Sequence, residues 1–443
     1  MTSPHSADQP FGAAGDSAAS AASAASAASA ASGDSGDSAD SSAETGTLNG
    51  VLVVDLSRAL AGPHAAMMLG DLGARVIKVE TPGVGDDTRR WGPPFVGPVD
   101  DLQSTYFLSC NRNKESIALN LKDHHDLAVL TGLLERADVV IENFRAGVMD
   151  RLGLSTTELH AINPRLVILS ITGFGHDGPE ADRAGYDQIV QGEAGLMSLT
   201  GAGPDAVQRV GVPIADLLAG MYGAYGILSA LFERATTGRG QVVRTSLLSS
   251  VIGVHAFQGT RATVAGEVPL AQGNHHPSIA PYGLFQAADG AVQISVGSEK
   301  LWQALCERFE MDAAHPLMTT NALRVINREA TIAAVEEAFA GHSAAGLLET
   351  LREAGIPAGK VRTLDEVYAW DQVESQGLKV TVEHPLLGPV VLPGPPLRFF
   401  DTDATSNGEP RETETTKTAH GAPPLVNEHG DAIRSWLSAH REW

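Results

Sequence analysis

Between residues 51 and 171, short runs of branched apolar residues alternate with segments of helical spacing, and this alternation restricts the fold more than any other feature. The expected strands are 51–55, 75–80, 116–121, 138–142 and 165–171. The expected helices between them are 64–72, 125–136 and 156–162. Apolar strands separated by helices are typical of a parallel sheet covered on both faces. With right-handed crossovers, the pattern predicts a Rossmann-like α/β domain.

The N-terminal segment 1–47 has a different composition, because it is almost entirely Ala, Ser, Gly and Asp, and no Lys or Arg precedes Arg58. It lacks the basic start and the apolar stretch of a secretory signal, and the arginines of a transit peptide. Too little apolar surface is present to offset the entropy of ordering. We therefore expect a disordered tail, followed by a large domain over 48–265.

After residue 265 the pattern indicates a smaller α+β domain over 266–378. A hairpin is expected at 282–296 around Asp289–Gly290, with helices at 299–309, 331–340 and 343–354 and an extended piece at 355–361. The remaining segment, 379–443, should form two strands within 379–400, a polar loop over 401–420 and a final helix over 428–438.

The segment 214–232 is long and apolar enough to suggest a transmembrane helix. Asp216 lies inside it, however, and its Gly and Ala residues make it only weakly hydrophobic. A helix buried in a large core fits better. Gly220, Gly223 and Gly226 would then allow another backbone or a ligand to approach closely.

Charge and cysteine content exclude several classes of protein. The formal net charge is −22, which disfavours nucleic acid and anionic membranes as partners. Cys110 and Cys306 are the only two cysteines, too few for a disulfide framework or a four-cysteine zinc site, and this fits a reducing cytoplasm. The adjacent pairs His124–His125 and His275–His276 rarely chelate one metal, because neighbouring side chains diverge. We expect no metal site.

One glycine motif invites a dinucleotide-binding interpretation. Gly173, Gly175 and Gly178 follow the strand 165–171 with Gly-x-Gly-x-x-Gly spacing. A nucleotide-dependent dehydrogenase would place a helix directly after this motif, whereas Pro179 and a polar segment follow here. The spacing therefore favours a loop at the carboxyl end of a strand.

Asp216 is the strongest candidate for chemistry. A lone carboxylate in an apolar stretch of small residues is costly to bury without a partner. It follows Pro213 by three residues, at an expected helix N-terminus that favours negative charge. Two interpretations stay open at this point: a capping residue, or a nucleophilic or acid–base carboxylate.

Taken together, seven ordered segments resemble the class III CoA-transferase family, which includes formyl-CoA transferases and α-methylacyl-CoA racemases. The segments include LVVDLSRALAGPHAAMMLGDLGARVIKVETPGVGDDTR, ADVVIENFRAGVMDRLGL, AGYDQIVQGEAGLMSLTG, VGVPIADLLAGMYGAYGILSALFERATTGRGQVV and the closing PPLVNEHG. The resemblance covers nearly everything from residue 48 onward.

The resemblance implies an interlocked homodimer whose C-terminal segment, 379–443, returns to the large domain. It places the catalytic aspartate at Asp216, with Tyr186 and Asp187 beside the site. The CoA-binding positions that it implies are Leu60, Ala61, Leu119, Asn120, Leu121, Lys122, Asn143, Phe144, Arg145, Arg151 and Arg183. CoA and acyl-CoA would be substrates, with no permanently bound cofactor.

Differences from the family pattern bear on the substrate. A glutamine of formyl-CoA transferases is Leu60 here, and an arginine of those enzymes falls on Thr81, which argues against formate or oxalate. The racemase branch has histidine where this chain has Tyr186, and tyrosine is a poor acid–base group near neutral pH. The loop NHHPSIAPYG looks more like the branch that uses succinyl-CoA and dicarboxylic acids.

The resulting hypothesis is a transferase that moves CoA from an acyl-CoA donor to a carboxylate acceptor, through an aspartyl anhydride and an aspartyl-CoA thioester on Asp216. CoA is polyanionic, so local cations such as Lys122, Arg145 and Arg151 would have to bind it despite the negative net charge. The alternatives are an acyl-CoA racemase or isomerase on the same fold, and a CoA-binding protein without catalysis.

Overall fold

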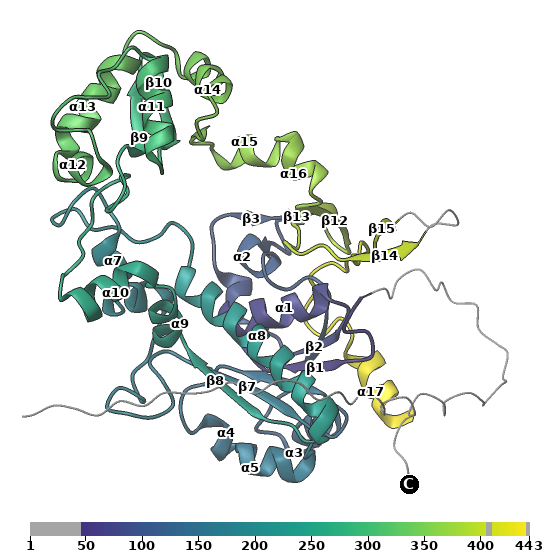
Figure 1. Cartoon of the computed structure of the whole chain (residues 1–443). Coiled ribbons are helices and arrows are strands. Elements are labelled where there is room, and N and C mark those ends of the chain that lie inside the picture. The colour runs from purple at the N-terminus through teal and green to yellow at the C-terminus, as the bar shows by residue number, and fades with distance from the viewer. Residues whose placement is uncertain (1–45, 405–409, 440–443) are drawn as a thin grey trace, which may run out of the picture. The chain divides into compact units, whose positions relative to one another are not determined.

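The computed structural model describes residues 46–404 and 410–439 (Figure 1). The predicted tail over 1–47 lies outside these residues apart from its last two, and it stays a prediction. The chain combines a six-stranded parallel sheet with helices and several small antiparallel sheets, which confirms the predicted α/β class.

The parallel sheet has the strand order β5-β2-β1-β6-β7-β8. Its strands are β1 (Leu52–Asp55), β2 (Arg75–Glu80), β5 (Lys114–Ala118), β6 (Val139–Glu142), β7 (Val167–Thr172) and β8 (Val242–Ser246). This is the strand order of the doubly wound fold, in which ligands bind at the carboxyl ends where the order reverses. Here the reversal falls between β1 and β6.

The sheet has two apolar faces because successive side chains of a strand point to opposite sides. Val53 packs into a cluster with α1 (Ala61–Asp71) and α8 (Ile214–Thr237), whereas Val54 packs with α3 (His124–Leu134) and α5 (Thr156–Ile162). Figure 1 shows α1 and α8 on one face and α3 and α5 on the other.

Helix α1 starts three residues earlier than the predicted 64–72. Pro63 is the third residue of the helix, a position that proline tolerates because its missing N–H would have no intrahelical partner. Helix α1 ends at Asp71, and its N-terminus lies toward the carboxyl end of β1. The loop that joins β1 to α1, residues 57–60, is therefore brought to the ligand-binding edge of the sheet.

Helix α8 packs one of its faces on the sheet and exposes part of the other. A Cβ built on Gly220 would lie 2.6 Å from the carbonyl oxygen of Ala61, so glycine permits the close approach of α8 to α1 that the sequence predicts. The sequence predicts a helix buried in a large core, whereas Tyr225 and Phe232 on the outer face are 72% and 84% exposed in the single chain. By length and composition, α8 is also the one helix within the described ranges that could cross a membrane.

Several short elements lie in the segments of chain that follow β2, β6, β7 and β8. They are η1 (Asp87–Arg90), β3 (Phe95–Val96), β4 (Gln103–Ser104), α2 (Thr105–Leu108), α4 (Val148–Arg151), α6 (Asp187–Glu193), α7 (Leu196–Leu199), α9 (Leu247–Gly253) and α10 (Ala256–Ala265). The sequence did not predict α6, although this helix supplies residues to the site.

The segment after residue 280 forms a second apolar core. The predicted hairpin is confirmed as β9 (Tyr282–Ala287) and β10 (Gly290–Ser295), and β11 (Ala358–Lys360) completes an antiparallel sheet. Its helices are α11 (Glu299–Arg308), α12 (Asn321–Ile326), α13 (Arg328–Phe339) and α14 (Ala344–Glu353).

The C-terminal segment contains more strands than predicted. Two short helices, α15 (Leu364–Tyr368) and α16 (Asp371–Ser375), precede it. Its own elements are β12 (Lys379–His384), β13 (Gly388–Pro393), β14 (Phe400–Ala404), β15 (Pro410–Glu414) and α17 (Gly430–Ala439). The predicted loop over 401–420 is wrong, because β14 and β15 pair there as an antiparallel hairpin. Polar strands of this kind have no apolar alternation that the sequence could reveal.

The closing PPLVNEHG segment binds the edge strand β5. The amide nitrogen of Ala118 donates to Asn427 Oδ1 at 2.9 Å, and that of His429 donates to the carbonyl oxygen of Ser116 at 3.0 Å. Helix α17 then packs Ile433 and Leu437 into the cluster formed with α3. The C-terminal segment therefore covers the edge of the parallel sheet.

Candidate active site

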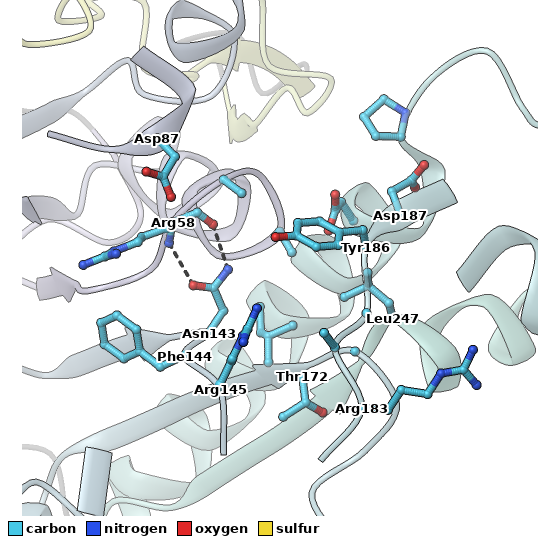
Figure 2. Close-up of a pocket in the computed structure, with 18 of the residues that line it drawn as sticks. Arg58, Asp87, Asn143, Phe144, Arg145, Thr172, Arg183, Tyr186, Asp187 and Leu247 are labelled. Carbon is cyan, nitrogen blue, oxygen red and sulfur yellow. Dashed lines mark hydrogen bonds between the residues drawn. The ribbon is translucent and has the colours of Figure 1, made fainter. Parts of the chain in front are cut away.

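A cavity of about 640 Å³ opens at the carboxyl ends of β1, β6 and β7, beside the point where the strand order reverses. Figure 2 shows how side chains from these loops and from the α6 and α9 segments surround it. It is lined by Arg58, Ala59, Ala61, Asp87, Trp91, Tyr106, Asn143, Phe144, Arg145, Ala146, Ile171, Thr172, Gly173, Ala181, Asp182, Arg183, Ala184, Gly185, Tyr186, Asp187, Gln188, Pro213, Asp216 and Leu247.

Asp216 enters the cavity wall from the first turn of α8. It is the third residue of the helix and does not cap it, because the N-cap is Pro213, which offers no side-chain acceptor. The capping role passes to Asp187, whose Oδ1 accepts a hydrogen bond from the amide of Ala215 at 2.8 Å. Gln191 donates to Asp187 Oδ2 at 2.7 Å and so fixes that carboxylate.

The electrostatics of Asp216 differ from the prediction that the helix terminus keeps this carboxylate readily ionised. Burial, followed by the nearby charge of Asp187, raises the pKa of Asp216 from 3.8 to about 7. Burial and a like charge both disfavour the ionised form, and here they outweigh the favourable helix dipole. Asp216 therefore titrates near neutral pH, which is typical of residues that do acid–base or nucleophilic chemistry.

The loop of residues 57–60 is tied to the end of β6 by one side-chain amide. Asn143 Oδ1 accepts from the amide nitrogen of Arg58 at 2.8 Å, and Asn143 Nδ2 donates to the carbonyl oxygen of Arg58 at 2.7 Å (Figure 2). The guanidinium of Arg58 donates to Thr81 Oγ1 at 3.2 Å and lies 5.5 Å from the ring of Phe144. The two loops thus form one wall of the cavity.

The cavity brings together most of the residues that the sequence analysis singled out. Those that line it are Ala61, Asn143, Phe144, Arg145, Arg183, Tyr186, Asp187 and Asp216. Those that do not are Leu60, Leu119, Asn120, Leu121, Lys122 and Arg151. The side chain of Leu119 is buried in the core beneath the sheet, whereas Lys122 and Arg151 are exposed. Contact between these six residues and CoA stays a prediction.

Sequence reasoning missed two aromatic residues of the site. Trp91 and Tyr106 pack edge to face, with ring centroids 5.1 Å apart, and both line the cavity. Burial, and next the charge of Asp216, raise the pKa of the Tyr106 phenol, which therefore stays neutral and able to donate a hydrogen bond. They lie in short elements after β2 that have no periodic pattern, so no sequence signal pointed to them.

The glycine motif of residues 173–178 forms the loop after β7, as predicted. The next helix, α6, begins only at Asp187, so the helix that a dinucleotide phosphate requires directly after the motif is missing there. Within the ranges that the structure describes, no cluster of three or more His, Cys, Asp or Glu residues could hold a metal ion.

The fold and the site define an α/β enzyme whose cavity, at the switch point of a doubly wound sheet, contains a buried carboxylate with a raised pKa. The chain belongs to CoA-transferase family III, whose family model matches residues 48–415. It is therefore a CoA-transferase, and the resemblance seen in the sequence is confirmed.

Individual relatives match along most of their length. Succinyl-CoA:glutarate CoA-transferase of Homo sapiens is 38% identical over 394 residues, which cover 88% of this chain and 89% of the relative. Acetyl-CoA:oxalate CoA-transferase of Acetobacter aceti is 39% identical over 399 residues, covering 89% and 96%. The crystal structure of a CAIB/BAIF family protein from Brucella suis superposes with a TM-score of 0.76 at 39% identity, covering 89% of this chain and 100% of that one.

Proposed function

We propose that this enzyme transfers CoA from an acyl-CoA donor, succinyl-CoA in the first instance, to a dicarboxylic acid, with Asp216 as the nucleophile. The observation that carries the proposal is the position of Asp216: a carboxylate with a pKa near 7 in the wall of the cavity at the switch point. Such a group is ionised at neutral pH often enough to attack, and more nucleophilic than an ordinary aspartate.

The proposed chemistry begins with the donor. A carboxylate oxygen of Asp216 attacks the thioester carbonyl, the C–S bond breaks, and CoA leaves as the thiolate with the electron pair. The thiolate then attacks the aspartyl carbonyl of the mixed anhydride and releases the donor acid as its carboxylate. An aspartyl-CoA thioester remains on Asp216.

The acceptor repeats these two steps in reverse. Its carboxylate attacks the aspartyl thioester and expels CoA thiolate, and the thiolate attacks the acceptor carbonyl of the new anhydride. The products are the acceptor's CoA thioester and free Asp216. One thioester is broken and one is formed, so covalent catalysis divides a nearly balanced exchange into separate steps. The neutral phenol of Tyr106 is available to donate to an oxyanion in the same cavity.

The cations of the cavity support CoA as the carrier. Arg58, Arg145 and Arg183 line it in a chain with a net charge of −22. Arg183 is also paired with Glu180 and Glu193, so Arg58 and Arg145 are better placed to meet phosphate groups. Guanidinium groups can bind phosphates even though the cavity is also lined by the four aspartates Asp87, Asp182, Asp187 and Asp216.

The relatives support a dicarboxylate as the acceptor. Glutarate, oxalate and mesaconate appear in the names of proteins that are 36% to 39% identical to this chain. Leu60 and Thr81 replace the glutamine and arginine that the resemblance assigns to formyl-CoA transferases, and we therefore place oxalate last among these acceptors. Tyr186 lines the cavity, and 63% of its surface is exposed. It occupies the position at which the racemase branch has histidine, and this favours transfer over racemisation.

A homodimer, which the family resemblance implies, is part of the proposal. Tyr225 and Phe232 on α8, with Val264 and Val268 beyond it, expose large apolar side chains in the described part of the chain. Large exposed apolar side chains of this kind are available for contacts with a second copy of the chain. Light scattering should give twice the chain mass of 46.2 kDa, and a monomer at micromolar concentration would reject this part of the proposal.

The decisive experiment supplies succinyl-CoA with a panel of mono- and dicarboxylic acids and separates the acyl-CoA products by chromatography. We expect a new dicarboxylyl-CoA, and a loss of about a thousandfold or more in Asp216→Asn and Asp216→Ala, because neither side chain can form the anhydride. CoA binding should persist in both variants. Full transfer by either variant would disprove the role of Asp216, and no product from any acid would disprove the proposed activity.

A further inference from the structure

A buried group of charges lies beneath the cavity and takes no part in the proposed chemistry. Lys78 on β2 and Asp55 at the end of β1 are fully buried, and Asp86 is 2% exposed. Lys78 Nζ lies 2.9 Å from Asp86 Oδ2 and 3.9 Å from Asp55 Oδ2. Burying charges is costly, and a buried pair contributes little net stability compared with apolar residues of the same volume. Stability alone therefore does not explain why these charged residues are buried here.

Asp55 Oδ2 also accepts a hydrogen bond from the buried Lys114 Nζ at 3.0 Å. Other hydrogen bonds of these charges go to the loop of residues 57–60. Lys78 Nζ donates to the carbonyl oxygen of Ser57 at 2.9 Å, and the amide nitrogen of Ser57 donates to Asp55 Oδ1 at 3.0 Å. The amide nitrogen of Ala59 donates to Asp86 Oδ1 at 3.4 Å. Burial by itself would lower the pKa of Lys78, but Asp86 and Asp55 outweigh it and raise the pKa, so the lysine stays charged.

Asp86 is itself held in place by its own turn. Its Oδ1 accepts from the amide nitrogen and the hydroxyl of Thr88, at 2.9 and 2.8 Å. Its amide nitrogen donates to Glu80 Oε2 at 2.9 Å. The carboxylate that meets the loop is therefore fixed from several directions.

The loop needs such support, because Ala59 has a left-handed backbone with φ of +64°. A residue with a Cβ resists this conformation, whereas glycine adopts it readily. The loop also folds tightly over the first turn of α1: a Cβ on Gly62 would lie 2.2 Å from that of Ser57. Strained backbone of this kind is retained at functional sites when the surroundings fix it.

The strained residue belongs to the cavity. Ala59 and Ala61 line it together with Asp216, and the carbonyl oxygen of Ala61 is in close contact with α8 at Gly220. A displacement of the loop would therefore change both the shape of the cavity and the packing of the helix that carries Asp216.

We propose that the Lys78–Asp86 pair is a positioning device that holds Ala59 in its left-handed conformation and thereby sets the part of the cavity wall that Ala59 and Ala61 form. The proposal rests on the proposed function, since it assigns the pair to the same cavity. Asp86 is a positioning residue and touches no reacting atom.

The test is a double-mutant cycle of Asp86→Asn and Ala59→Gly, read as kcat and KM for CoA transfer. Asn keeps an acceptor but loses the charge that pairs with Lys78, so we expect kcat to fall at least tenfold. Glycine needs no support at residue 59, so Ala59→Gly should raise the kcat of Asp86→Asn at least threefold relative to its effect on the wild type, and this difference between the two backgrounds is the readout. The proposal is wrong if Asp86→Asn keeps its kcat, or if Ala59→Gly has the same effect in both backgrounds.

A second buried pair provides the matched control. Arg112 Nε donates to Asp71 Oδ1 at 2.7 Å, and Asp71 ends α1 at the opposite end from the loop of residues 57–60. Asp71→Asn should lower the melting temperature, because it removes the charge of a buried ion pair. Adding Ala59→Gly should not raise the kcat of the Asp71→Asn variant. A rescue there as well would show a general effect of glycine on stability and would overturn the proposal.

A milder variant keeps the test decisive if Asp86→Asn does not fold. Thr88→Val removes the hydroxyl donor to Asp86 and leaves both charges, so we expect a folded protein whose kcat falls two- to fivefold and recovers with Ala59→Gly. An unchanged kcat would count against the proposal. Wild-type transfer and the inactivity of Asp216→Asn are measured in the same series, so that a failure of the proposed function is recognised separately.

Discussion

Asp187 Oδ1 accepts a hydrogen bond from the amide of Ala215 at 2.8 Å, so a residue of α6 caps the helix that carries Asp216. The cap is needed because Pro213 precedes the helix and has no side-chain acceptor. Burial, and next the charge of this same carboxylate, raise the pKa of Asp216. One side chain therefore both positions the proposed nucleophile and contributes to its raised pKa.

These two roles of Asp187 can be separated by substitution. Asp187→Asn keeps an oxygen to cap Ala215 but removes the like charge, so the pKa of Asp216 should fall. The nucleophile is the ionised form, and kcat/KM for the wild type should therefore rise with pH up to about 7 and level off above it. In Asp187→Asn the rising limb should move to lower pH, with a nearly unchanged melting temperature.

Asp187→Ala is the control for the cap. It loses the charge and the acceptor together, and we expect about 1 kcal/mol less free energy of unfolding, with a lower kcat at every pH. A rising limb that stays near pH 7 in both variants would show that Asp187 does not influence the titration of Asp216.

The pH dependence of stability gives an independent check of the raised pKa. The folded-state pKa of Asp216, about 7, lies above the value near 3.9 of an unfolded chain, so the native state binds this proton more tightly. Ionisation between these values destabilises the fold, and the wild type loses stability relative to Asp216→Asn as the pH rises from 4 to 7. Chemical denaturation at pH 8 should give Asp216→Asn a larger free energy of unfolding than the wild type. This difference in free energy should become smaller toward pH 5. A constant difference would mean that Asp216 titrates normally.

How far the sequence predicts this structure depends on whether a feature is local. β2 and α5 match their predicted bounds, and Asp216 stands out as a charge in an apolar run, because these signals lie within a few neighbouring residues. The cap by Asp187 joins residues 28 positions apart, and Asn143 meets Arg58 across 85 positions. Nothing local distinguishes Lys78 in RVIKVE from an exposed strand residue, and only the fold brings Asp86 to it.

We expect the N-terminal segment to contribute neither to the active site nor to the stability of the fold. Residues 1–45 contain six acids and no Lys or Arg, so their removal changes the net charge from −22 to −16. Because they carry no apolar periodicity, deletion should leave kcat, KM and the melting temperature nearly unchanged. A melting temperature lower by more than about 4 °C would show that the segment packs on the remainder of the chain.

The proposed covalent route can be tested on the nucleophile itself. Donor thioester without acceptor should leave CoA on Asp216, since the thiolate and the acyl group exchange places on one carboxylate. Borohydride reduces an aspartyl thioester to the alcohol, and hydroxylamine converts it to a hydroxamate, so either reagent should alter the tryptic peptide that follows Arg209 and ends at Arg234. Mass spectrometry should place the change on Asp216 and find none in Asp216→Asn.

Direct attack of the acceptor on the donor thioester would leave the peptide unaltered, as would acid–base racemisation. An unaltered peptide, from enzyme shown to be active in the same tube, would therefore reject the anhydride route.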